Sequence, residues 1–189
     1  MALAPLSAVD PSALRWLRTR DRPAAFSLRA GDVELARLDW ERPGGSLATA
    51  ATSDATWTLK RAGFLQPTIL VRDPVDPQAV ARHTAHLARH EVALGSGATY
   101  RLRRVSHLIP AWRLTTDRGE EVLHVEPVPE GRTLGAGAVV VSAPQTPEVL
   151  LLVVLTWYFI VLSWFEDEAI ETLAPFEGFD PPMARGGPS

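Results

Sequence analysis

Polar and apolar residues alternate in short stretches through much of residues 13–148. In each stretch single polar residues separate apolar ones, as Ser27 separates Phe26 from Leu28, and a new stretch begins about every ten residues. A period of two places neighbouring side chains on opposite faces of a β-strand. Turn-forming residues such as Gly31, Gly97 and Gly119 punctuate the pattern. The sequence therefore predicts many short strands, with the pattern clearest at 26–29, 33–37, 56–60, 69–71, 100–103, 112–115 and 122–126.

The pattern predicts one supersecondary structure clearly and leaves the secondary structure of another segment open. Residues 112–115 and 122–126 alternate on either side of Asp117-Arg118-Gly119, which predicts a β-hairpin. Residues 77–91 fit two structures. Apolar and polar positions at helical spacing, together with several alanines, favour a helix, whereas the family resemblance described below favours a strand.

One long apolar run stands apart from the alternating pattern. Residues 149–165, VLLLVVLTWYFIVLSWF, contain 17 consecutive positions without a charge. Thr146 can cap a helix, Pro147 suits its first turn, and Glu148 suits the positive end of its dipole. A helix that is apolar all round cannot face water. The run therefore predicts a helix that either crosses a membrane or is enclosed by its own chain.

The length of the run and the position of its aromatic residues bear on these two alternatives. Seventeen helical residues span about 25 Å, whereas a bilayer core of about 30 Å usually needs nearer 20 residues. Trp157 and Tyr158 lie near the middle of the run, although membrane spans usually carry such residues at their ends. A barrel of about a dozen strands offers another place for the helix, because its lumen is too wide for its own side chains to fill.

Composition indicates a globular domain and excludes several classes of protein. The chain has 189 residues, 46% of them hydrophobic and 22% charged, as in ordinary globular proteins. It contains no cysteine, which excludes disulfides and thiolate metal sites. A net charge of −3 gives no reason to expect nucleic-acid binding. The N-terminus lacks a signal-peptide pattern, so we expect a cytoplasmic protein that is peripheral at the membrane, or a single-pass membrane protein if the helix spans.

Four features in a fixed order resemble a known family. They are WTLKRAGFLQPTILVRD (57–73), GSGATYRLRR (95–104), AWRLTTDRGEEVLHVEP (111–127) and the terminal apolar helix. This order resembles the tubby C-terminal-like superfamily, which includes tubby domains, phospholipid scramblases and plant LURP-one-related proteins. The resemblance covers about residues 40–169. It implies a mainly β fold, a closed antiparallel barrel of about 12 strands around a central hydrophobic helix at about 147–170. The expected organisation is a lead-in at 1–24, the barrel domain at 25–172 and a loose tail at 173–189.

Basic residues are the best candidates for ligand contact. Residues 77–116 hold six arginines, one acidic residue and four of the five histidines, a bias that favours an anionic partner. Arginine matches phosphate geometry, and tubby domains bind phosphoinositides through basic surface residues. We therefore expect a non-enzymatic protein that binds anionic membrane lipid headgroups or a partner at the membrane surface. The candidate residues are Lys60, Arg61, Arg101, Arg103 and Arg104. An ordinary polar barrel exterior explains the same residues without a ligand.

Other chemistry has little support in the sequence. His83, His86 and His90 would share one face of a helix, but no nearby Asp or Cys completes a metal site. Nucleophile-elbow, P-loop and dinucleotide motifs are absent from the sequence. We therefore predict no catalytic residues, no metal and no cofactor. Two alternatives stay open: a single-span membrane protein with a strand-rich cytoplasmic domain, and an enzyme whose site lies at the barrel mouth.

Overall fold

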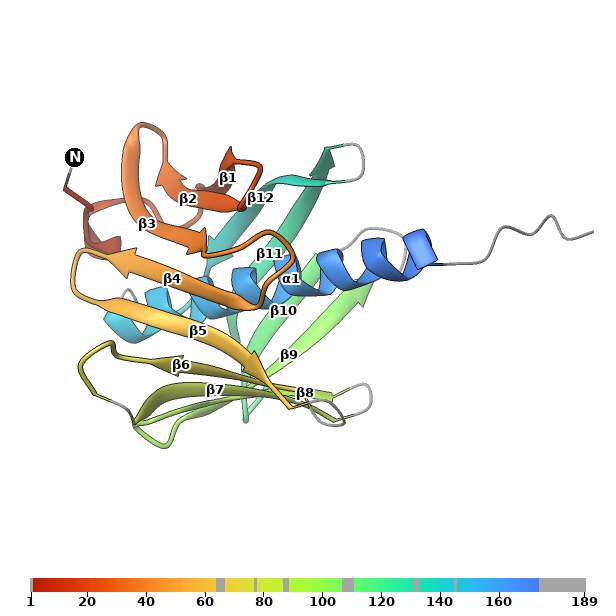
Figure 1. Cartoon of the computed structure of the whole chain (residues 1–189). Coiled ribbons are helices and arrows are strands. Elements are labelled where there is room, and N and C mark those ends of the chain that lie inside the picture. Colours follow the sequence, from red (N-terminus) through yellow and green to blue (C-terminus); the bar gives the residue numbers. More distant parts are fainter. Residues whose placement is uncertain are drawn as a thin grey trace, which may run out of the picture.

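The computed structural model describes residues 2–63, 67–76, 78–86, 89–106, 111–130, 133–144 and 146–173. Twelve antiparallel strands close into a barrel, and one long helix runs through it (Figure 1). The predicted fold class is therefore confirmed. The elements are η1 (Leu6–Ala8), β1 (Leu14–Arg20), β2 (Ala25–Ala30), β3 (Val33–Trp40), β4 (Leu47–Thr52), β5 (Thr56–Ala62), β6 (Thr68–Arg72), β7 (Ala79–His86), β8 (Arg89–Leu94), β9 (Thr99–Ser106), β10 (Ala111–Thr116), β11 (Glu121–Glu130), β12 (Thr133–Val141) and α1 (Pro147–Leu173).

Each strand pairs with its neighbours along the chain, and the first strand pairs with the last. The closing pair places Trp16 of β1 opposite Gly137 of β12. In the predicted hairpin, Trp112 lies opposite Val125 and β10 pairs with β11 as expected. The region at 77–91, for which helix and strand were both open, contains parts of the paired strands β7 and β8. Closure leaves no sheet edge available to another chain.

The barrel begins earlier than the sequence indicated. Strand β1 lies within residues 1–24, where we expected only a lead-in. Leu14 and Trp16 point into the barrel and are buried, whereas Arg15 and Leu17 between and after them are exposed. The difference arises because three arginines in LRWLRTR make this strand look like a polar surface segment. Two of its apolar residues nevertheless belong to the core.

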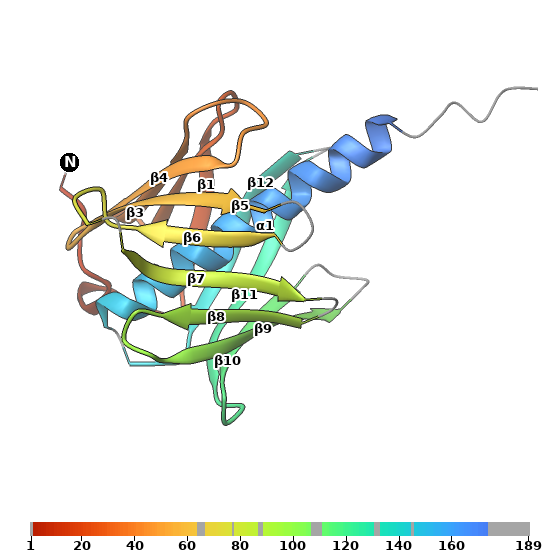
Figure 2. The same cartoon turned by 60° about the horizontal axis from the view of Figure 1, so that its bottom comes forward.

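The apolar helix fills the barrel. Figures 1 and 2 show α1 passing through the ring of strands and leaving it at the end where β5 terminates. Every residue from 149 to 162 is buried. The segment Pro147–Glu166 is long and apolar enough to cross a membrane, yet 78% of its apolar 18-residue window is buried inside this protein. The barrel wall therefore gives the helix the apolar surroundings that its sequence requires.

Aromatic residues at the middle of the helix fix its position against the wall. The Trp157 ring stacks on Trp16, with ring centroids 5.7 Å apart and planes at 6°, and meets Phe26 edge-on at 5.5 Å. Gly137 lies under the same indole, and a Cβ atom there would overlap the Trp157 ring. The indole can therefore reach the backbone of β12 only because residue 137 is glycine.

The next helical residue contacts a different part of the wall. Tyr158 stacks on Trp40, with centroids 5.3 Å apart, and its hydroxyl donates a hydrogen bond to the backbone carbonyl of Ser46. Burial raises the pKa of Tyr158 above its ordinary value, so the hydroxyl keeps its proton and remains a donor. Successive residues of a helix point about 100° apart. Adjacent aromatic residues at the centre of α1 thus tie it to separate strands.

Replacing Leu155 with arginine tests whether the helix is enclosed. Leu155 is 1% exposed, so Leu155→Arg would bury a charge without a partner. The expected loss of several kcal/mol is comparable to the whole stability of a small domain. We expect no soluble protein with a cooperative thermal transition, as followed by circular dichroism. Val140→Arg is the control, because Val140 lies on the outer face of β12 at 38% exposure, and this variant should melt like the wild type. A folded, cooperative Leu155→Arg protein would contradict the enclosed helix.

Candidate functional site

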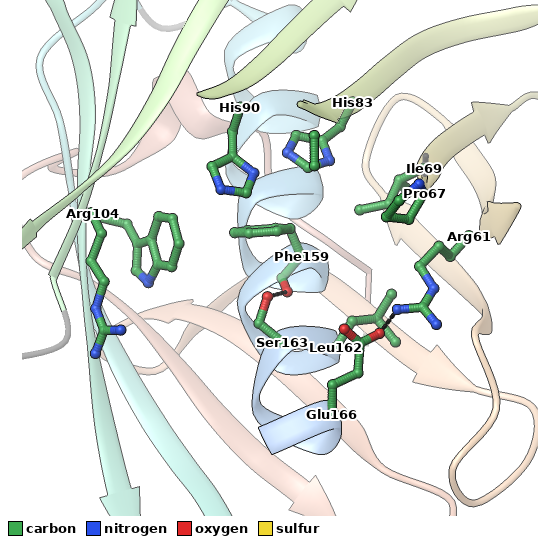
Figure 3. A pocket seen from close by; sticks show the side chains of 12 residues that line it. Arg61, Pro67, Ile69, His83, His90, Arg104, Phe159, Leu162, Ser163 and Glu166 are labelled. Carbon is green, nitrogen blue, oxygen red and sulfur yellow. Dashed lines mark hydrogen bonds and ion pairs between the residues drawn. The ribbon is translucent and has the colours of Figure 1, made fainter. Parts of the chain in front are cut away.

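A cavity of about 290 Å³ lies between the helix and one side of the barrel, near the end from which α1 emerges (Figure 3). Its wall combines inward-facing residues of β5 to β10 with one face of the helix. Aromatic and aliphatic groups form most of that wall, with five ionisable side chains among them. The lining residues are Arg61, Pro67, Ile69, His83, Ala85, His90, Arg104, Trp112, Phe159, Leu162, Ser163 and Glu166.

The cavity exists because the helix is not centred in the barrel. The helix approaches β3, β11 and β12 more closely than the other strands. Gly137 permits that approach on β12. On the opposite side small residues face the gap, Ala85 from β7 and Ser163 from α1. The lumen of a barrel this wide exceeds the volume of one helix, and the excess space is collected on this side.

Two stacked histidines form the inner part of the cavity wall. The rings of His83 on β7 and His90 on β8 have centroids 5.4 Å apart and planes at 10°. Phe159 of the helix packs against both, at 4.7 Å from His83 and 4.9 Å from His90, and Figure 3 shows the two imidazoles side by side next to this ring. Trp112 meets Phe159 edge-on at 5.0 Å. The histidines therefore belong to an aromatic cluster.

Three of the four ring nitrogens of these histidines are buried without a hydrogen-bond partner among the described residues. Within the described residues, neither ring nitrogen of His83 has a hydrogen bond, nor does Nδ1 of His90. Burial lowers the pKa of His83 to about 3, with the neighbouring His90 adding to the effect, and burial also lowers the pKa of His90. Near neutral pH both rings are uncharged, each with one donor and one acceptor nitrogen. Unpaired buried polar atoms are uncommon in folded proteins, so they mark this wall as a place for a ligand or ordered water.

Two arginines line the cavity, and only one of them forms an ion pair with a described residue. Arg61 of β5 forms an ion pair with Glu166 of α1 (dashed in Figure 3). Arg104 of β9 is exposed, lies opposite Trp112 on the neighbouring strand, and has no ion pair or hydrogen bond within the part of the chain that the structure describes. Arg104 is therefore the cation that the cavity offers to an incoming anion.

The five basic residues singled out from the sequence do not form one cluster. Strand alternation turns Arg61 and Arg104 inward, to the cavity, as it does Leu59 and Leu102. Lys60, Arg101 and Arg103 occupy the opposite, outer face of the same strands and are exposed. The structure thus brings together Arg61 and Arg104 and leaves the other three on the outside of the barrel.

From the sequence, His83, His86 and His90 were considered as metal ligands and as part of a basic region that favours an anionic partner. The lone pairs of an imidazole lie in its ring plane, so two nearly parallel rings do not direct them to a common point. The side chain of His86 lies outside the described residues. Among those residues no group of three or more His, Cys, Asp or Glu side chains could hold a metal ion. The cluster with Phe159 and Trp112 was not foreseen, because it depends on which inward positions of distant strands lie side by side.

The arrangement is suited to binding more than to nucleophilic chemistry. Ser163 is the hydroxyl-bearing residue of the lining, and it donates to the backbone carbonyl of Phe159 at 3.0 Å. That bond is internal to the helix, and among the described residues no hydrogen bond joins Ser163 to a histidine or a carboxylate that could act as its base. What the cavity presents is an apolar wall, two neutral imidazoles and a free guanidinium, the mixture typical of ligand pockets.

Comparison with known proteins identifies no family. No family model matches the chain, and neither does any curated protein or any solved structure. The fold and site define a helix-filled, twelve-stranded β-barrel protein with a cavity at one end. The resemblance to the tubby C-terminal-like superfamily stays a prediction.

Acid should destabilise the protein through His83. The imidazole is held neutral in the folded state, with a pKa of about 3 instead of about 6.5, so the unfolded chain binds more protons between those pH values. Stability is therefore retained above about pH 6.5 and falls as the pH is lowered toward 3. Between pH 7 and pH 5 we expect His83 to account for a loss of about 2 kcal/mol. Denaturant unfolding at both pH values measures it.

The matched variant for this titration is His83→Phe, which keeps a ring in the aromatic cluster and removes the titrating group. Its free energy of unfolding should change less between pH 7 and pH 5 than that of the wild type. An identical acid-induced loss in both proteins would show that His83 is not the buried neutral group described above.

Proposed function

We propose that this protein binds, without catalysis, the headgroup of an anionic lipid in the cavity at the end of the barrel. The observation that carries the proposal is Arg104, a cation beside an aromatic wall that has no ion pair or hydrogen bond with any described residue. A guanidinium presents several N–H donors in a plane that matches phosphate oxygens. A phosphate on Arg104 would be bordered by Trp112, whose aromatic ring limits access of water to the charge pair.

The size of the cavity favours a headgroup. A volume of about 290 Å³ corresponds to about ten water molecules at their liquid density. That space accommodates a phosphate with a short attached chain, but not two long acyl chains. Pro67, Ile69 and Leu162 supply apolar surface for the part of the lipid nearest the headgroup. The acyl chains would remain outside the barrel, in the membrane from which the headgroup is drawn.

The charge around the cavity favours one specific ligand over general adsorption to an anionic surface. Arg61 is already neutralised by Glu166, and the emerging helix continues with Asp167, Glu168 and Glu171 in its sequence. The described residues at this end of the barrel therefore do not form a flat basic face of the kind that holds a membrane by many weak contacts. We place the protein in the cytoplasm, peripheral at the membrane, as part of the same proposal.

The enclosed helix speaks against the single-span alternative. Moving α1 into a bilayer would withdraw the apolar residues 149–162 from the barrel. The inward faces of twelve strands, including Trp16, Trp40 and Leu59, which are at most 2% exposed, would lose their main packing partner. Filling a core at native density contributes much of a protein's stability, so the span would require the barrel to collapse or unfold.

Substituting Arg104 tests the proposal. Binding of short-chain phosphatidylglycerol, dispersed as monomers and titrated by calorimetry, should weaken about tenfold or more in Arg104→Ala, because a charge-assisted hydrogen bond to phosphate is lost. Glu166→Gln should strengthen binding, since it frees Arg61 for the phosphate. Arg15→Ala, on the outer face of β1, is the control and should leave the affinity unchanged.

An anion could instead bind to the basic residues on the outer face of the barrel. The same titration of Arg103→Ala, whose substituted side chain lies on that face, tests this alternative. Loss of affinity in Arg103→Ala with none in Arg104→Ala would move the anion site to the outside of the barrel. Absence of binding to the wild type would refute the proposed function.

A further inference from the structure

The inner wall of the cavity carries a second recognition element that the anion site does not use. His83 is 2% exposed, lines the cavity, and has both ring nitrogens without a hydrogen bond among the described residues. His90 is stacked on it and also carries a buried, unpaired Nδ1. Packing explains where these rings lie but not why they are imidazoles. Phenylalanine would stack equally well and would bury no polar atoms.

We infer that the cavity selects a hydroxyl-bearing anion of the glycerol phosphate class, with a hydroxyl group against His83 and the phosphate on Arg104. This inference rests on the proposed function, since it names the chemistry of the anionic headgroup bound at the same cavity. It adds the part of the ligand that lies deeper than the phosphate and the residues that recognise it.

Hydrogen-bond complementarity is the reason for choosing a hydroxyl group. A neutral imidazole presents one donor nitrogen and one acceptor nitrogen, and a hydroxyl group can pair with either, because it can accept from the N–H or donate to the bare nitrogen. A phosphate or carboxylate oxygen can only accept, and would place its lone pairs against the bare nitrogen of the ring. An ammonium group can only donate, and a trimethylammonium group can do neither. Among small polar groups the hydroxyl satisfies this wall most fully.

The cavity offers room for two hydroxyl groups on neighbouring carbon atoms, one facing each histidine. His83 and His90 stand 5.4 Å apart between ring centroids, and neighbouring hydroxyls on a three-carbon unit can address both rings. Phe159, in contact with each ring, forms an apolar boundary on the helix side. A glycerol unit fits this combination of two polar contacts and one apolar face within a volume of about 290 Å³.

A pair of phosphates that differ only in their hydroxyl groups tests the inference. Glycerol 3-phosphate and propyl phosphate have the same charge and the same three-carbon chain, but propyl phosphate has no free hydroxyl group. Calorimetric titration of the full chain should show glycerol 3-phosphate binding about tenfold more tightly. In His83→Phe this preference should disappear, because the phenyl ring offers the hydroxyl groups of glycerol 3-phosphate neither a donor nor an acceptor. His83→Gln, which retains a donor and an acceptor, should keep part of the preference.

The outcomes distinguish failure of hydroxyl recognition from failure of anion binding itself. If the wild type binds neither phosphate and also fails to bind short-chain phosphatidylglycerol, the proposed function fails. If it binds both equally, or if His83→Phe keeps the wild-type preference, the anion site stands and hydroxyl recognition by His83 is overturned. The wild-type comparison decides the question even if a variant does not fold.

A third ligand identifies the source of the hydroxyl-bearing anion. Tighter binding of monomeric short-chain phosphatidylglycerol than of glycerol 3-phosphate assigns the site to a lipid headgroup. Equal or weaker binding of the lipid assigns it to a free phosphate. The second result would overturn the lipid part of the proposed function, whereas recognition of the hydroxyl group is decided by the comparison with propyl phosphate.

Discussion

The rest of the structure depends on enclosing a helix that has no polar face. Seventeen uncharged positions in a row leave no side of α1 that could meet water, so its surroundings must be apolar in every direction. A closed sheet is one of few structures that a chain of this size can form to provide this. Pairing of β1 with β12 completes the enclosure, and the wall turns alternate side chains inward over the whole length of the buried helix.

The cavity follows from how the helix fits that wall. Trp157 approaches the backbone of β12 at Gly137, and Trp16, Phe26 and Trp40 fill the space on that side. Tight packing there draws the helix away from β5 to β10 and leaves unfilled volume beside His83 and His90. The ligand site is therefore not an addition to the barrel but a result of its asymmetric filling, and a larger residue at 137 should alter both the packing and the cavity.

Much of the fold could be predicted from local pattern, and the site could not. The two-residue period identified most strands, and the uncharged run identified the core helix, because both signals come from neighbouring residues. Strand β1 was missed because its arginines concealed Leu14 and Trp16. The period also implied that Arg101 and Arg103 share a face, but not that their face is the outer one. The meeting of His83, His90, Trp112 and Phe159 depends on the register of three strands and the rotation of the helix, which no local pattern specifies.

A nuclear Overhauser contact between the Hα protons of Gly137 and the ring protons of Trp157, in solution without detergent, tests the central claim most directly. The close approach of the two residues predicts a strong cross-peak and an upfield shift of the glycine protons from the indole ring current. A protein that dissolves only in detergent, or one that folds in water without this contact, would contradict a barrel built around the helix.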